Sequence, residues 1–173
     1  DIQTEIIENG ASDVVSMTIT ASGDPFASPT FRKLLQTLTE DQCPKLEKIY
    51  IITNGLLLKR YWDTLSEFAR DKIYSISVSI DAASADVYHV NRRGGKWIDL
   101  CENMDFISYL RTSKKIHDFN ASMVVQKNNF HEIRDFILFC ENHNVDMVQL
   151  QLYESDLGRD LGYANKGYSN WFE

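Results

Sequence analysis

The sequence predicts an α/β fold in which helices cover a parallel sheet. Segments of strand-like composition alternate with segments of helical spacing along the 173 residues. Strands separated by helices must pair in parallel, because only a crossover helix returns the chain to the same edge of the sheet. We therefore expect a doubly wound sheet or a partial (β/α) barrel of about five β–α units, with its helices on the outside.

Five segments are expected to form the strands, namely residues 13–20, 47–55, 73–81, 117–126 and 145–153. The third, "IYSISVSID", shows the strand alternation most plainly. It places Ile76 and Val78 on one face and Ser77 and Ser79 on the other. The two faces of this strand therefore differ in polarity.

The expected helices lie between these strands. Ser28 followed by Pro29 predicts an N-cap and the first position of a helix, whose apolar face includes Leu34 and Leu35. Two further helices are expected over residues 57–70 and 96–111. The stretch 88–97, "YHVNRRGGKW", is predicted to be a loop.

A last helix is expected to begin at Asn129, which with Glu132 resembles a capping box. The residues of this helix expected to face the core are Phe130, Ile133, Ile137 and Cys140. Residues 154–173 are interpreted as a loop or the start of a C-terminal extension, and residues 1–173 as one domain.

Composition limits the possible functions. Hydrophobic residues make up 43% and charged residues 25%, which is typical of a globular domain. The net charge of −7 argues against a general binder of nucleic acid or of anionic membranes. No apolar run has the length that spans a bilayer, and the three cysteines show neither a disulfide framework nor metal-ligand spacing. We expect a reducing, cytoplasmic setting.

Polar side chains follow every predicted strand. The strand ends read "ASGDP" (21–25), "TNG" (53–55), "SID" (79–81), "VQKNN" (125–129) and "QLYES" (151–155). Because the carboxyl ends of parallel strands share one edge, we expect Asp24, Asn54 and Asp81 to surround a common cavity for a polar small molecule. The alternative is that each is only a turn signal or the N-cap of the next helix.

Two arginines, Arg92 and Arg93, precede the pair Gly94-Gly95. This motif has two interpretations. One is an arginine fork that holds a carboxylate or a phosphate, and the other is a solvated basic loop.

Several enzyme motifs are absent from the sequence. His131-Glu132 lacks the second histidine of a zinc helix, and there is no GxGxxG, P-loop or GxSxG pattern. Two alternative functions stay open. One is a (β/α)-barrel lyase or aldolase with Asp24 or Asp81 as general base and Lys127 as a Schiff-base residue. The other is a non-catalytic binding module.

The ordered set "SGDP … TNG … SID … RRGG … VVQKNN" resembles the radical S-adenosylmethionine (radical SAM) superfamily over about residues 13–152. The resemblance implies a partial barrel and an enzyme that uses S-adenosylmethionine with a [4Fe–4S] cluster. The cluster is held by a CxxxCxxC loop after the first strand of such enzymes. It also implies that a 5′-deoxyadenosyl radical abstracts hydrogen from a substrate.

The resemblance implies roles for four residues after the first strand seen here. Ser22, Gly23, Asp24 and Pro25 take the place of the family's Gly-Gly-Glu-Pro motif, which binds the amino group of the cofactor. Asp24 is one methylene shorter than the glutamate that it replaces.

Other cofactor-binding roles implied by the resemblance lie at later strand ends. Thr53 and Asn54 would lie close to the site, and Ser79 and Asp81 would approach the carboxylate or the ribose. Either Arg92 or Arg93 would pair with the cofactor carboxylate. The residues implied to flank the adenine are Val125 and Leu152.

The sequence departs from the family at the cluster. It has no CxxxCxxC, and Cys43, Cys101 and Cys140 fall in separate predicted elements. We therefore expect a central fragment that lacks the first strand and the cluster loop, holds no metal and is inactive alone. The intact parent would take a small-molecule or peptide substrate and an electron donor such as flavodoxin or ferredoxin.

Overall fold

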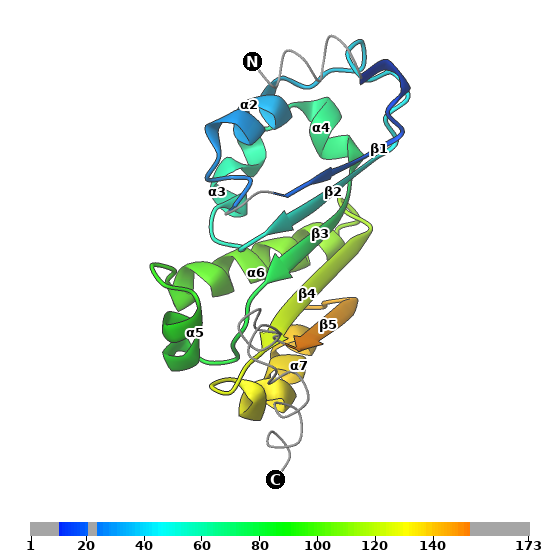
Figure 1. Ribbon diagram of the computed structural model, residues 1–173. Coiled ribbons are helices and arrows are strands. Elements are labelled where there is room, and N and C mark those ends of the chain that lie inside the picture. The colour runs from blue at the N-terminus through cyan, green and yellow to red at the C-terminus, as the bar shows by residue number, and fades with distance from the viewer. Residues whose placement is uncertain (1–10, 21–23, 153–173) are drawn as a thin grey trace, which may run out of the picture.

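A computed structural model describes residues 11–20 and 24–152, and it contains one sheet of five parallel strands (Figure 1). The strands are β1 (Ser16–Ile19), β2 (Lys48–Thr53), β3 (Ile73–Ser79), β4 (Asp118–Val125) and β5 (Met147–Leu152). They pair in chain order, β1 to β5, and each pair is parallel. The predicted parallel sheet is confirmed, and all five carboxyl ends lie along one edge.

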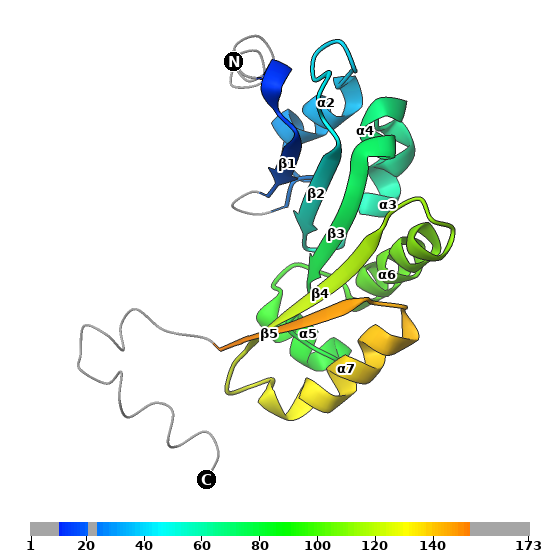
Figure 2. The same ribbon diagram turned by 90° about the vertical axis from the view of Figure 1, so that its right-hand side faces the viewer.

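The helices between the strands cover one side of the sheet. The α-helices are α2 (Pro29–Thr37), α3 (Leu58–Tyr61), α4 (Glu67–Lys72), α5 (Ala85–Asn91), α6 (Trp97–Thr112) and α7 (Ile133–Asn142). Three 3₁₀ turns accompany them: η1 (Ala11–Asp13), η2 (Trp62–Thr64) and η3 (Phe130–Glu132). Figure 2 shows α3, α4, α6 and α7 on the same side of the sheet.

Strand alternation gives the sheet two different faces. The residues of β3 and β4 that point toward the helices are apolar and buried, as in the pairs Ile76–Phe119 and Val78–Ala121. The opposite face carries the pairs Ser77–Asn120 and Ser79–Ser122, whose members are all half-buried. We call these the helix-covered face and the open face.

Local sequence signals explain where several helices begin. Ser28 caps α2 as predicted, since its hydroxyl accepts a hydrogen bond from the Phe31 amide. The single helix predicted over residues 57–70 is wrong, because this segment forms α3, η2 and α4. Leu65 is extended, and Ser66 begins a new helix by accepting from the Ala69 amide.

Two other local predictions are also wrong. The stretch 88–97 is not all loop, because α5 runs through Asn91, with Ser84 as its N-cap. Asn129 and Glu132 do not form a capping box, because both side chains bind backbone and hydroxyl groups elsewhere in the chain. Of the residues expected in the core, Cys140 is buried and Ile133 packs against the core, whereas Phe130 and Ile137 are exposed. Phe136, which the spacing did not predict, is completely buried instead.

Some predictions cannot be compared with the structure. Ser22, Gly23 and the segment 154–173 lie outside the described residues. None of the helices in residues 11–20 and 24–152 is long and apolar enough to cross a membrane.

Candidate functional site

Asp24 joins the loop after β1 to the end of β2. Its carboxylate is buried and accepts from the Phe26 amide at 2.9 Å, from the Asn54 amide at 2.8 Å and from the Thr53 hydroxyl. The Thr53 hydroxyl in turn accepts from the Gly55 amide. An ionised carboxylate offers about four acceptor positions, so within the described residues Asp24 keeps capacity for another donor.

Gly55 shapes the same edge. Its φ is +76°, and a Cβ there would lie 2.6 Å from Val78 Cγ1 and 3.0 Å from Leu100 Cδ1. Only glycine combines this backbone with so close a contact. The "TNG" sequence therefore places Asn54 at the strand end by bringing the turn tightly against β3 and α6.

A second polar group forms at the ends of β3 and β4. Asp81, at φ +62°, is buried and accepts from the Val124 amide at 2.7 Å. Its other carboxylate oxygen pairs with Arg92 Nη2 at 2.6 Å. Arg92 Nε is buried without a hydrogen-bond partner among residues 11–20 and 24–152. A buried donor without an acceptor costs about 1–3 kcal/mol, which a ligand acceptor would relieve.

The structure separates the two candidate arginines. Arg92 follows α5 directly and pairs with Asp81, whereas Arg93 is exposed. Gly95 lies against a buried side chain. A Cβ at Gly95 would lie 2.8 Å from the hydroxyl of the buried Tyr88, so this glycine makes room for the tyrosine.

The remaining implied residues lie along the same edge. Pro25 is buried beside Asp24 in sequence, and the Ser79 hydroxyl lies 3.3 Å from the Ser122 hydroxyl on the open face. Val125 and Leu152 are direct partners in the last rung of the β4–β5 ladder; Val125 is buried and Leu152 is exposed. The roles of all these residues in cofactor binding stay predictions.

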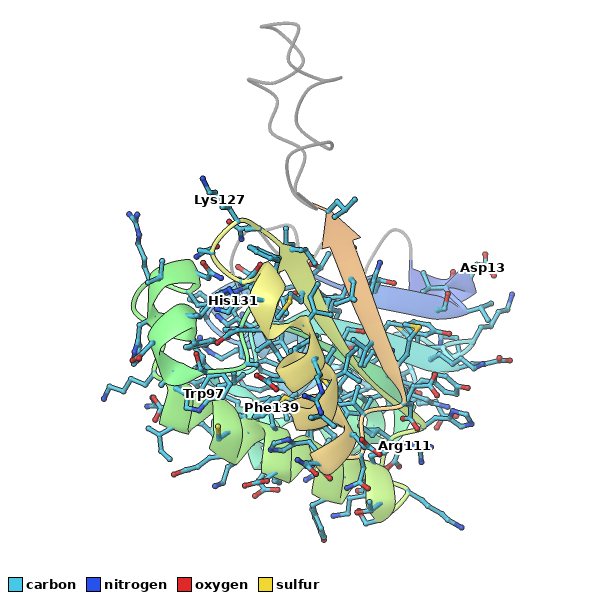
Figure 3. All side chains as sticks on the ribbon, turned by 90° about the horizontal axis from the view of Figure 1, so that it is seen from below. Asp13, Trp97, Arg111, Lys127, His131 and Phe139 are labelled. Carbon is cyan, nitrogen blue, oxygen red and sulfur yellow. The ribbon has the colours of Figure 1, made fainter. Side chains whose placement is uncertain are left out.

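The polar groups therefore gather in two clusters on neighbouring strands, one around Asp24 and one around Asp81. Among the described residues, a cavity of about 430 Å³ lies at the amino ends of the strands and is lined by residues such as Tyr74, Arg111 and His117. Figure 3 shows Arg111 and Lys127 at opposite ends of the strands. The cavity is thus separate from the carboxyl edge.

Three residues at this edge have roles that the sequence did not predict. Asn91 donates to the Asp81 carbonyl, and so does Asn129, which is completely buried. Glu132 is also buried and accepts from the Ala83 amide and the Ser84 hydroxyl. The sequence signal for Asn129 and Glu132 was their spacing of three residues, but this local pattern predicts a capping box.

The cysteines do not fit an iron–sulfur cluster. Cys43 and Cys140 are buried, and Cys101 is half-buried. Burial raises the pKa of all three thiols, that of Cys140 to about 12, whereas a cluster needs thiolates. The described part of the chain contains no group of three or more His, Cys, Asp or Glu that could hold a metal ion.

Lys127 is exposed in the loop after β4, and Figure 3 shows it pointing away from the sheet. A Schiff-base lysine is activated by an apolar pocket or a second cation. The described surroundings of Lys127 supply no such environment, so no observation favours the aldolase alternative.

Comparisons with known proteins bear on this site. No protein-family model matches the chain. It is 25% identical over 160 residues to GTP 3′,8-cyclase of Alkaliphilus metalliredigens, covering 92% of this chain and 47% of that protein. It is 27% identical over 143 residues to GTP 3′,8-cyclase of Staphylococcus epidermidis, covering 82% and 38% respectively. The chain therefore spans less than half the length of these two relatives.

Solved structures share the fold. SuiB of Streptococcus suis, in a crystal structure with S-adenosylmethionine, aligns with a TM-score of 0.60 and 18% identity, over 99% of this chain and 38% of SuiB. TYW1 with a lysine–pyruvate adduct aligns with a TM-score of 0.55 and 20% identity, over 82% of this chain and 42% of TYW1. These alignments confirm the predicted fold class.

Proposed function

We propose that this chain, whose predicted resemblance to radical SAM core domains the comparisons confirm, binds S-adenosylmethionine at the carboxyl edge of its sheet. The sequence relatives are enzymes, as the resemblance predicted. The chain acts as part of an enzyme of this class. When bound, S-adenosylmethionine supplies the radical chemistry, while the residues of the chain bind and orient it.

The observation that carries this proposal is that a hydrogen-bond acceptor and a hydrogen-bond donor, each with unused capacity, lie at neighbouring strand ends. Asp24 is a buried acceptor with capacity for one more donor, which suits an ammonium group. Arg92 has a buried Nε without an acceptor among residues 11–20 and 24–152, which suits a carboxylate. An amino-acid moiety carries both groups, and the methionyl part of S-adenosylmethionine is such a moiety.

The [4Fe–4S] cluster does not fit the cysteines of this chain, which lie far apart in the sequence and whose thiol pKa values are raised by burial. We place its ligands outside these 173 residues, and we expect the chain alone to be inactive. No role in cluster chemistry falls to Cys43, Cys101 or Cys140.

The substrate is proposed only as a small molecule or a peptide. SuiB has also been crystallised with a precursor peptide, whereas the TYW1 structure holds a lysine–pyruvate adduct. One scaffold thus accommodates different molecules, and the fold does not select among them. For the intact protein we propose an electron donor such as flavodoxin or ferredoxin.

Calorimetric titration with S-adenosylhomocysteine tests the binding proposal. This probe keeps the amine, carboxylate and ribose of the cofactor and needs no cluster. Asp24→Ala should weaken binding by about 1–3 kcal/mol, the usual cost of a lost charge-assisted hydrogen bond. Asp24→Asn keeps an acceptor toward the Phe26 amide and serves as a second variant if the alanine protein misfolds.

Asp13→Ala is the matched control. Asp13 is an exposed carboxylate that pairs with Lys45, and its removal should leave the affinity unchanged. Equal affinity of wild type and a folded Asp24 variant contradicts the assignment of Asp24. Absence of any binding by the wild-type chain contradicts the proposed function itself.

A further inference from the structure

The loop after β3 is held by a side chain from the neighbouring β4–α7 connection. Glu132, 7% exposed, accepts from the Ala83 amide at 2.7 Å and from the Ser84 hydroxyl at 2.5 Å. Ser84 is the N-cap of α5. Glu132 therefore fixes the first turn of α5 from 48 residues away in the sequence.

The other end of α5 is attached to the same loop. Asn91, the last residue of the helix, donates to the Asp81 carbonyl at 2.7 Å, and Arg92 pairs with the Asp81 carboxylate. Asn129 donates to the Asp81 carbonyl as well, at 3.0 Å, and to the Val124 carbonyl at 2.9 Å. Asp81 thus contacts the C-terminal end of α5 through Asn91 and Arg92, and it contacts β4 through Val124.

The helix α5 depends on these contacts for its position. It has seven residues, and a helix of this length is not stable by itself in water. Its buried side chain is Tyr88, whose ring lies 5.5 Å from that of Trp97, at the start of α6. The Tyr88–Trp97 contact and the half-buried Val87 pack the middle of α5 against the core, whereas the polar contacts fix its two ends.

We propose that Glu132 is a positioning residue, which places Arg92 for its ligand by holding the first turn of α5. The inference rests on the proposed function, in which Arg92 receives the cofactor carboxylate. Glu132 itself touches the loop and the cap and has no direct contact with Arg92 among its described hydrogen bonds. Its effect on Arg92 must therefore pass through the loop that carries Asp81 and through α5.

A double-mutant cycle with S-adenosylhomocysteine distinguishes this role from a general loss of stability. Glu132→Ala should lower the affinity about tenfold, which is the lower end of the loss seen when the outer partners of metal ligands are removed. In an Arg92→Ala background the same change should alter the affinity less than about twofold, because the residue that it positions is gone. Glu132→Gln keeps an acceptor for the Ala83 amide and should restore most of the affinity.

Ser108→Ala is the control for stability. The buried Ser108 hydroxyl accepts from Asn144 at 2.8 Å, at the far end of α6. Its removal should lower the melting temperature and leave the affinity unchanged. Where the wild-type chain binds the probe, an equal loss of affinity from Glu132→Ala with and without Arg92, or no loss at all, overturns the proposal.

A second measurement separates this inference from the proposed function. Without ligand, the Nε–H NMR signal of Arg92, assigned by its loss in Arg92→Ala, should shift in Glu132→Ala and stay in place in Ser108→Ala. If the wild-type chain binds no probe but this signal shifts, the proposed function fails and the positioning role stands. An unchanged signal in Glu132→Ala overturns the positioning role, whether or not the probe binds.

Discussion

The two faces of the sheet differ in composition and in burial. On the helix-covered face, Ile76, Val78 and Phe119 are completely buried. On the open face, the Asn120 amide donates to the Ser75 hydroxyl at 3.1 Å, and the Ser79 and Ser122 hydroxyls pair. A single run of alternating residues builds both faces, because successive side chains of a strand point to opposite sides.

The comparison teaches that apolar burial and polar hydrogen bonding are divided between the two faces of β3 and β4. Burial of the helix-covered face supplies the hydrophobic stabilisation, at about 25 cal/mol per Å² of apolar surface. The open face and the carboxyl edge carry hydroxyl, amide and carboxylate groups, whose hydrogen bonds contribute less to stability. Substitutions on the two faces should therefore have unequal effects on stability.

The largest effect is expected from Phe119→Ala. It removes a fully buried ring from the helix-covered face and should lower the free energy of unfolding by about 3–5 kcal/mol. Asn120→Ala, at the next position on the open face, should cost less than about 1 kcal/mol. Urea denaturation of both variants measures the difference, and similar losses would contradict the division between the faces.

A smaller effect is expected where the helix-covered face meets the carboxyl edge. Gly55→Ala would place a Cβ 2.6 Å from Val78 and retain a φ of +76°, so we expect a loss of about 2–3 kcal/mol. Gly94→Ala is the matched control. It shares a positive φ but has no atom within 4 Å of the new Cβ, and it should cost about 1 kcal/mol. Equal losses of unfolding free energy in the two variants would show that the positive φ alone, and not the close contact with Val78, causes the destabilisation.

The smallest effect on stability is expected from the ion pair between Arg111 and Asp146, which links the helix layer to the sheet. Asp146 accepts from Arg111 of α6 at 2.7 and 2.9 Å and from the Phe119 amide of β4 at 2.8 Å. The hydrogen bond from the Arg111 side chain is the main cause that holds the pKa of Asp146 below its usual 3.8. The hydrogen bond from the Phe119 amide lowers this pKa further. A carboxylate with a lowered folded-state pKa adds stability above its unfolded pKa and loses it as the pH falls through the folded value.

Asp146→Asn should therefore be about 1 kcal/mol less stable than wild type at neutral pH, and the difference should disappear as the pH falls through the folded-state pKa of Asp146. Urea denaturation at several pH values measures this. Asp63→Asn is the control, since the Asp63 carboxylate is 95% exposed, and it should match wild type throughout. A difference for Asp146→Asn that persists at low pH would assign the loss to packing instead of charge.

The candidate site was predictable in part. The positions of Asp24, Thr53, Asn54 and Asp81 at strand ends followed from the strand pattern and from parallel pairing. The partners of these residues did not, because Asp24 meets Thr53 across 29 residues and Asp81 meets Val124 across 43. Asn129 and Glu132 matched a local cap pattern, yet each found stronger partners in the β3 loop.

The sequence by itself determined the alternation of strands and helices, the parallel sheet and the unequal polarity of its faces. These features follow from periods of two and about 3.6 residues, which act within a few positions of the chain. Only the tertiary structure decided that α5 forms, that Arg92 pairs with Asp81, and that Glu132 holds the neighbouring loop. Such contacts depend on which strand ends become neighbours, and a short helix or a buried carboxylate is stable only after that packing is complete.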